Sequence, residues 1–295
     1  MKTHRPLLLL LSCILSVLLC ACSPLAYSEG DEPETKPAEL SEYDGELYFD
    51  GRRYTYKGDA ENISAEADRL TVKKGGSYLL SGELSEGRVI IDCAETVRLC
   101  LGGVSLSSAT GAVVEQRRGG LIIETLGDSI NRLESKSAEG DGILPHGCVY
   151  STGDISFLGS GSLFIGSECD GISSGGSVYV EGGEISLRAK KRGIFARNSI
   201  DMTGGELTVT YAETGMYAFG GEYSRGSIAI SGGRLVAVCS ETGLFAEREI
   251  YVCGGGGEVK AKIPYKCERA ADGKTEKGRV SITVNSFAGL SAKEE

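Results

Sequence analysis

The sequence contains no tryptophan and has only two histidines and six prolines among its 295 residues. His146 is the one histidine that follows the N-terminal apolar segment. His146 alone does not make a Ser-His-Asp site, which also needs a serine and an aspartate beside it, or a multi-histidine metal site, so we interpret it as a turn residue. The cysteines show no Cys-x-x-Cys spacing, which argues against a zinc site.

Basic surface and helical periodicity are also lacking. The chain has 31 Lys and Arg against 41 Asp and Glu, so no surface for nucleic acid is evident. No stretch after the N-terminal segment holds a 3.6-residue period with caps over a dozen residues, which argues against a helical protein. Residues 254–257 are four glycines, but no Gly-Lys-(Ser/Thr) follows them, which excludes a phosphate-binding loop. Glycine itself is abundant, with 43 residues, and with so little proline it predicts many tight turns.

The N-terminus is typical of an exported protein. Lys2 and Arg5 precede an apolar run of 15 residues, 7–21, which is too short to favour a membrane span and fits a secretory signal. The run ends in Leu-Cys-Ala-Cys, residues 19–22, which resembles the lipobox of bacterial lipoproteins more closely than an Ala-x-Ala cleavage site. The resemblance implies cleavage before Cys22, a lipid on its thiol, and a location on the extracellular face of the bacterial cell membrane.

The second half of the chain repeats with a period of 22 or 23 residues and one step of 28. Within each repeat, apolar residues alternate with polar ones, which is the pattern of half-buried strands. Three short strands per repeat predict a parallel β-helix, a solenoid in which each strand pairs with its counterpart one coil away. A β-sandwich would not keep the spacing of the columns constant. The inward columns are predicted to be Ile155, Val178, Ile200, Ile228 and Ile250; Phe157, Val180, Met202, Ile230 and Val252; Leu163, Ile185, Leu207, Leu235 and Val259; and Cys148, Ile172, Ile194, Met216 and Leu244.

These patterns divide the chain into five segments. The step of 28 residues places six extra residues between Ala218 and Gly226, and inserts of this kind often carry binding. The segments are a signal peptide (1–21), a disordered acidic tether (22–44), N-terminal strands that form a cap (45–74), the parallel β-helix (75–262), and a C-terminal cap and tail (263–295).

Five short motifs follow one another between residues 75 and 261, namely Tyr78–Gly82, Leu99–Leu106, Gly127–Leu133, Gly159–Leu163 and Asp170–Ile172. Their order resembles the carbohydrate-binding β-helix family first recognised in cellulose-degrading clostridia. The resemblance implies a right-handed parallel β-helix similar in shape to pectate lyases, with a polysaccharide partner such as cellulose or an acidic glycan. It also implies bound calcium, whereas catalysis is not implied.

The chain departs from this family in the column that precedes each Gly-(Ile/Met/Leu) pair, where relatives usually have aspartate. Calcium needs about six to eight oxygen ligands, several of them from carboxylates. Asp170 is therefore expected to be at most a weak metal ligand, and no other cofactor is expected. The column is predicted to contain His146, Asp170, Arg192, Thr214 and Thr242.

The residue after each inward aliphatic side chain supplies the candidate carbohydrate site. This outward column is predicted to contain Val149, Ser173 and then Phe195, Tyr217 and Phe245 on three successive coils. Exposed aromatic rings can stack on the apolar face of a sugar, and Phe219 and Tyr223 of the insert are expected to flank them. The alternative is that the rings form a purely structural stack.

The basic run Lys190, Lys191 and Arg192 supplies candidate bases for a lyase, with a solvated basic corner as the alternative. Seven cysteines remain after Cys22, an odd number, and we interpret most of them as small buried apolar residues. The sequence thus predicts a membrane-anchored lipoprotein whose β-helix binds polysaccharide without cleaving it. A structural or adhesive solenoid without a sugar ligand, and a calcium-dependent polysaccharide lyase, are the competing hypotheses.

Overall fold

The computed structural model describes residues 42–51, 53–66, 69–137, 147–221, 223–271 and 274–290. They form 27 β-strands and one short 3₁₀ helix, Ala60–Asn62, so the all-β prediction is confirmed. Across these ranges no helix is long and apolar enough to cross a membrane. The predicted signal peptide, Cys22 and His146 lie outside the described residues.

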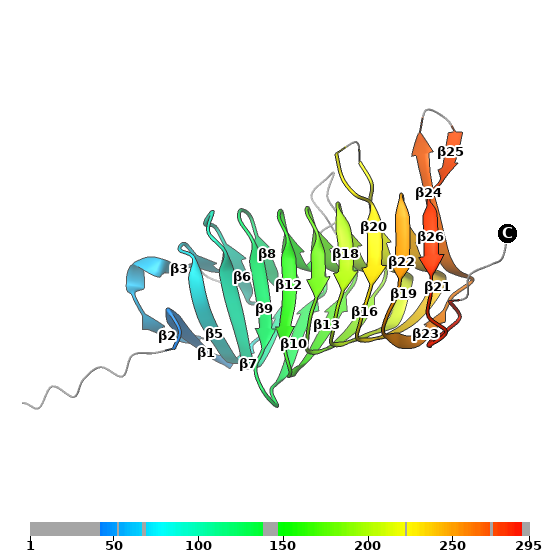
Figure 1. The fold of residues 1–295 in the computed structure, drawn as a ribbon. Helices are drawn as coiled ribbons and strands as arrows, with labels where there is room; N and C mark the ends of the chain where they lie inside the picture. The colour runs from blue at the N-terminus through cyan, green and yellow to red at the C-terminus, as the bar shows by residue number, and fades with distance from the viewer. Residues whose placement is uncertain are drawn as a thin grey trace, which may run out of the picture. The chain divides into compact units, whose positions relative to one another are not determined.

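The strands are arranged in three ladders of mainly parallel pairs (Figure 1). The first ladder contains β4 (Arg69–Val72), β6 (Arg88–Ile91), β8 (Val114–Gln116), β11 (Gly147–Ser151), β14 (Asp170–Ser174), β17 (Arg192–Ala196), the second halves of β19 (Glu206–Ala218) and β21 (Arg234–Ala246), and β24 (Ile263–Ala271). The second ladder contains β1 (Gly45–Gly51), the first halves of β5 (Gly76–Leu84) and β7 (Val97–Ser108), and then β9 (Leu121–Thr125), β12 (Ile155–Gly159), β15 (Val178–Val180), β18 (Ser199–Met202), β20 (Ser227–Ile230), β22 (Glu249–Val252) and β26 (Arg279–Ile282). The third ladder contains the second halves of β5 and β7, then β10 (Ile130–Ser135), β13 (Ser162–Ser167), β16 (Glu184–Ala189), the first halves of β19 and β21, β23 (Gly256–Lys260) and β27 (Phe287–Ala288). Three further strands, β2 (Tyr54–Gly58), β3 (Ile63–Glu66) and β25 (Lys274–Lys277), pair antiparallel with β1, β4 and β24.

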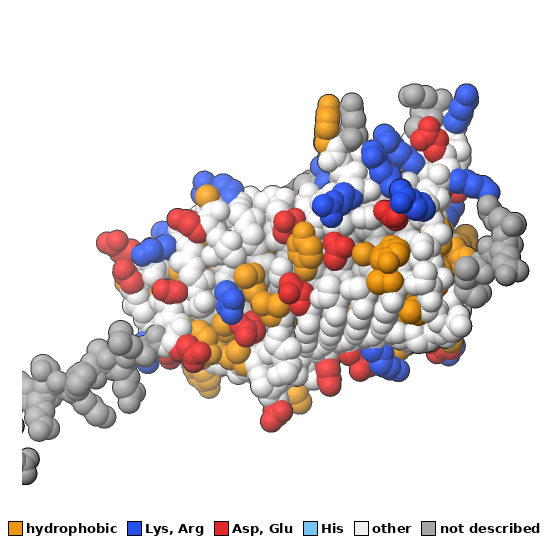
Figure 2. All heavy atoms as spheres, in the orientation of Figure 1, with side chains coloured by type: hydrophobic (Ala, Val, Ile, Leu, Met, Phe, Trp, Pro, Cys, Tyr) orange, Lys and Arg blue, Asp and Glu red, His pale blue; other side chains and the backbone are white. Residues whose placement is uncertain are grey.

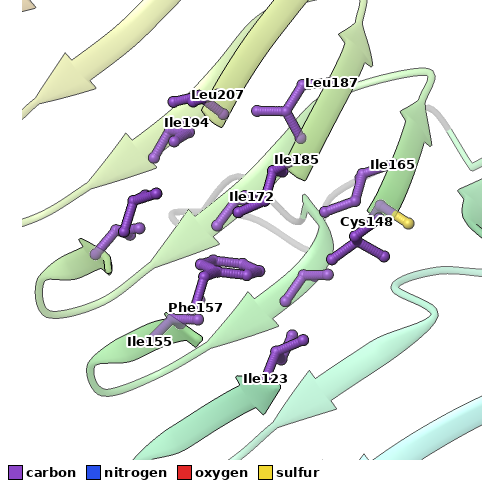
Figure 3. Packing of buried hydrophobic residues seen from close by; sticks show 14 of the residues in the cluster. Ile123, Cys148, Ile155, Phe157, Ile165, Ile172, Ile185, Leu187, Ile194 and Leu207 are labelled. Atoms are coloured by element: carbon purple, nitrogen blue, oxygen red, sulfur yellow. The ribbon is translucent and has the colours of Figure 1, made fainter. Parts of the chain in front are cut away.

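The core lies between the ladders, because alternate side chains of most ladder strands point toward the other two ladders, as the burial patterns of β9, β12 and β16 show. Ile155, Ile172 and Ile185 come from the second, first and third ladders and are each at most 2% exposed. Figure 3 shows side chains of this kind turned toward one another between the strands. Each fully buried aliphatic side chain contributes about 1.5–3 kcal/mol, so these stacked columns supply the main stabilisation.

The register confirms the predicted columns that begin at Ile155 and Phe157, but one member of each of the other two columns is wrong. Leu235 pairs with Gly257, and Val259 pairs with Ala237 instead of continuing the Leu163 column. Val149, not Cys148, pairs with Ile172, and Tyr150 pairs with Ser173. All five residues of β11 are buried, so alternation between apolar and polar residues could not set its register. The same shift places Gly147, not His146, beside Asp170.

The turns between the second and third ladders depend on glycine. Gly159 has a φ of +96°, and a Cβ at this position would lie 2.0 Å from the carbonyl oxygen of Thr125. Glycine is the residue that adopts positive φ without a steric cost, and here it also allows the neighbouring backbone to approach.

Parallel pairing extends beyond both predicted ends of the β-helix. β1 already pairs in parallel with β5, and β24 and β26 continue the first and second ladders past residue 262. The segments interpreted as caps therefore supply strands to the ladders. The antiparallel partners β2 and β3 lie at the N-terminal end, where an unpaired strand edge would otherwise be available for aggregation. β25 pairs with Glu268–Ala271 of β24, beyond the part of β24 that pairs with β21.

Candidate functional site

The predicted aromatic column does align in the structure. Phe195, Tyr217 and Phe245 occupy equivalent positions of β17, β19 and β21. The ring centroids of Phe195 and Tyr217 are 5.6 Å apart, and those of Tyr217 and Phe245 are 4.7 Å apart. Their interplanar angles of 79° and 78° make both contacts edge-to-face, so the rings do not form one flat platform.

The expectation that these three rings are exposed is wrong for Phe195, which is 5% exposed. The guanidinium carbon of Arg192 lies 4.1 Å from the centroid of Phe195 and 5.5 Å from that of Tyr217. Lys266 Nζ lies 5.6 Å from the centroid of Phe245. Cations therefore lie over the ring faces that a sugar would need, which favours the structural interpretation of this column.

Asp170 also has a different environment from the metal ligand expected of it. Its side chain is fully buried, and its two carboxylate oxygens accept hydrogen bonds from Arg192 Nε at 3.0 Å and Nη2 at 2.8 Å. Burial raises the pKa of Asp170, while the hydrogen bonds and charge of Arg192 oppose that rise. Because both oxygens accept hydrogen bonds from Arg192, they are not directed at a metal ion. Within the described ranges, no group of three or more His, Cys, Asp or Glu side chains is arranged to hold a metal ion.

The same ion pair bears on the candidate lyase bases. Arg192 is held by Asp170, and Lys190 forms an ion pair with Glu168. Lys191 is exposed. The run is thus largely a set of paired side chains at the start of β17, which fits the basic-corner interpretation.

The insert between β19 and β20 places its two aromatic residues at the surface. Phe219 is 37% exposed and Tyr223 is 94% exposed. Both line one hollow of about 520 Å³, together with Arg197 and Asn198. The hollow lies at the turn between the first and second ladders, whereas the Phe195 column lies on the first ladder itself.

Sequence reasoning missed a groove on the outward face of the third ladder, which we call the sheet groove. It crosses β10, β13, β16 and the first half of β19 and consists of two adjoining hollows of about 450 and 470 Å³. Phe164, which is partly exposed, lines both hollows, and Tyr211, which is 52% exposed, lines the first. The outward columns are Ile130, Ser162, Glu184 and Glu206; Arg132, Phe164, Ser186 and Thr208; and Glu134, Gly166, Arg188 and Tyr211.

The sheet groove combines aromatic rings with charges of both signs. Gly166 leaves the floor open between Glu134 and Arg188 in the neighbouring strands. Arg188 is exposed and makes no ion pair with any other described residue, while Arg132 lies 4.3 Å from the centroid of Phe164. Such a surface offers ring stacking together with donors and acceptors for hydroxyl groups.

In the third strand of each repeat, apolar residues alternate with polar and aromatic ones. The polar and aromatic residues were the signal for this groove, but only the apolar residues were used in the prediction. Tyr211 could not have been found in this way. The register shifts between Leu187 and Arg188, so that Arg188 pairs with Tyr211 instead of Thr210. A bulge of this kind is set by the neighbouring strands and leaves no clear pattern in the sequence.

Comparisons with known proteins place these observations among relatives. A family profile described as "Carbohydrate-binding domain-containing protein" matches residues 66–293. A protein of the same description from Acetivibrio thermocellus is 21% identical over 194 residues, which cover 62% of this chain and 65% of that relative, slightly less than two thirds of its length. A solved structure described as a polysaccharide lyase-like protein from C. thermocellum, a gadolinium derivative, is 21% identical with a TM-score of 0.76 and covers 84% of this chain and 100% of that one. At this level of identity the structural similarity shows the fold alone.

Proposed function

The chain belongs to the family of carbohydrate-binding domain-containing proteins, and from this premise we propose that its three ladders form a right-handed parallel β-helix that binds polysaccharide in the sheet groove without cleaving it. The partner is a cellulose-like or acidic glycan. The lipobox-like residues 19–22 support anchoring of the protein through Cys22 on the extracellular face of the bacterial cell membrane.

The sheet groove is the observation that carries this proposal. Its four strands span about 14 Å at a strand spacing of about 4.8 Å, a length suited to an extended ligand that contacts several coils. Phe164 and Tyr211 offer apolar ring surface, and Glu134 and Arg188 offer an acceptor and donors for hydroxyl groups. An open, amphipathic groove of this kind fits a polymer better than it fits a small molecule that must be enclosed.

Binding without cleavage is supported by the state of Asp170 and of two of the three basic side chains that a lyase would use, with exposed Lys191 as the third. Arg192 is committed to Asp170, and Lys190 is paired with Glu168. Asp170 directs both oxygens at Arg192 and supplies none to a calcium ion that would acidify a sugar proton.

The test is a glycan array probed with the full-length chain, purified in detergent, and with the variants Phe164→Ala and Tyr211→Ala. Each substitution removes a stacking surface and is expected to weaken binding about tenfold. Tyr48→Ala is the matched control, because Tyr48 is 57% exposed but lies on β1.

Binding that survives both groove substitutions would contradict the assignment of the groove. A chain that binds no glycan at all would favour a structural or adhesive solenoid. Steady formation of unsaturated product from polygalacturonate and calcium would contradict the non-catalytic proposal.

A further inference from the structure

The hollow beside the insert is formed by three successive turns at the same corner of the ladders. We call it the insert pocket and define it by Gly175, Gly176, Arg197, Asn198, Phe219 and Tyr223. The two glycines follow β14, Arg197 and Asn198 follow β17, and the insert follows β19. The glycines provide a floor without side chains, and the two aromatic residues form a wall.

The insert is held against this corner by specific hydrogen bonds. The backbone N–H of Arg225 donates to Asn198 Oδ1 at 2.8 Å, and Arg248 Nη2 donates to the carbonyl of Gly221 at 2.9 Å. The ends of the insert also approach closely, since a Cβ on Gly226 would lie 2.6 Å from the Cα of Gly220. The backbone of the insert is therefore positioned before any ligand arrives, which lowers the entropic cost of binding.

Arg197 is the unusual side chain in the insert pocket. It is half-buried, and its guanidinium makes no hydrogen bond or ion pair with any other described residue. By contrast, Arg192, on the same strand–turn unit, is fully engaged by Asp170. The charge of Arg197 acts on Tyr150, where it opposes the rise in pKa that burial causes. An arginine has five N–H donors, and a partly desolvated guanidinium that donates none of them to a protein acceptor is suited to a carboxylate or phosphate.

The charges around this corner reinforce the same preference. Arg225 and Arg248 are exposed at the insert and at the following turn. Two carboxylates also lie nearby: Glu247 accepts a hydrogen bond from the hydroxyl of Tyr217 at 3.2 Å, and Asp154, beside Gly176, accepts one from the N–H of Ser177 at 2.6 Å. Figure 2 shows Lys and Arg side chains gathered over the upper ends of β20, β22 and β26. Arg197, Arg225 and Arg248 thus place three cations at this corner of a chain whose formal net charge is −10, which favours an anionic group near Arg197.

We propose that the insert pocket is a second binding site, separate from the sheet groove, for a sugar residue that carries an anionic group. Phe219 and Tyr223 stack on the sugar ring, and Arg197 donates to the carboxylate or phosphate. The inference rests on the proposed function and extends it, because it assigns recognition of the anionic group to Arg197 at a separate site.

The test measures binding of three small probes to the full-length chain in detergent by titration calorimetry. The probes are a trigalacturonate, N-acetylglucosamine 6-phosphate and neutral cellotriose, so that a carboxylate, a phosphate and no charge are compared. The variants are Arg197→Gln and Tyr223→Ala in the insert pocket, and Tyr211→Ala in the sheet groove. Arg53→Gln is the matched control, because it removes the same charge from an exposed residue next to β2, at the other end of the ladders.

At least one anionic probe is expected to bind, roughly 10- to 100-fold more weakly in Arg197→Gln and more weakly at high salt, with Arg53→Gln unchanged. The probe that binds identifies carboxylate or phosphate as the preferred group. The inference is overturned if neither anionic probe binds, or if their binding is unchanged in Arg197→Gln. If Tyr211→Ala abolishes anionic binding and Arg197→Gln does not, the anion occupies the sheet groove and only the proposed function survives. If the insert variants lose anionic binding while no polymer binds the groove, the inference survives without the groove.

Discussion

Separating Asp170 from Arg192 should destabilise the first ladder strongly. Asp170 is fully buried and Arg192 is 19% exposed, so removal of either partner leaves a charge with little access to water. Breaking a buried ion pair costs about 3–5 kcal/mol, and the partial exposure of Arg192 places the loss for Asp170→Asn near the lower end. For a folded domain of the size of this β-strand region, a loss of about 3 kcal/mol in the free energy of unfolding lowers the Tm by about 6–12 °C.

The reverse variant, Arg192→Met, should depend on pH. Burial raises the pKa of Asp170 above its ordinary value of 3.8, and loss of the opposing Arg192 contacts raises it further. A folded-state pKa above the unfolded value means that the folded protein holds the proton more tightly, so stability from this group increases as pH falls. The deficit of Arg192→Met should therefore be largest at pH 7 and shrink toward about pH 4.

Urea unfolding followed by far-UV circular dichroism measures both effects, because the chain has no tryptophan to report by fluorescence. The double variant Asp170→Asn/Arg192→Met leaves neither charge unpaired. It should lose less than the two single variants together by about 2 kcal/mol or more, and it should lack the pH dependence. Additive losses, or an Arg192→Met deficit that is the same at pH 7 and pH 5, would refute the reasoning.

Two further predictions concern the turns and the thiols. Gly159→Ala should lower the free energy of unfolding by about 2 kcal/mol or more, because its Cβ would meet the Thr125 carbonyl; Gly103→Ala has a similar φ of +86° but no atom within 4 Å, and it should cost only about 1 kcal/mol in the same urea experiment. Burial raises the pKa of Cys239 to about 11, so at pH 8 its alkylation by iodoacetamide should be at least about 100-fold slower in the folded chain than in urea. Equal rates in the two states, measured by mass spectrometry, would contradict the buried position of this thiol.

The sequence by itself was sufficient for the parts of the fold that depend on local alternation. Apart from Cys148 and Val259, the columns that contain Ile155, Ile172 and Leu163 were correct, because each strand repeats the same inward pattern and an inward aliphatic side chain must stack on its neighbour. The alignment of Phe195, Tyr217 and Phe245 followed from the same spacing. The position of the insert also followed, because extra residues in a constant period have to leave the ladder.

Only the tertiary structure decided what covers the outward side chains. Alternation tells which residues point away from the core, but Phe195 points outward and is still buried, because Arg192 of its own strand lies against its ring. Asp170 became an ion-pair partner through the same arginine, which stands beside it only after parallel pairing. The sheet groove depends on a bulge that brings Tyr211 beside Arg188. The contacts of Asp170 with Arg192 and of Arg188 with Tyr211 join residues of neighbouring coils, and their geometry is set by register and packing, whereas the alternation pattern is set by each strand alone.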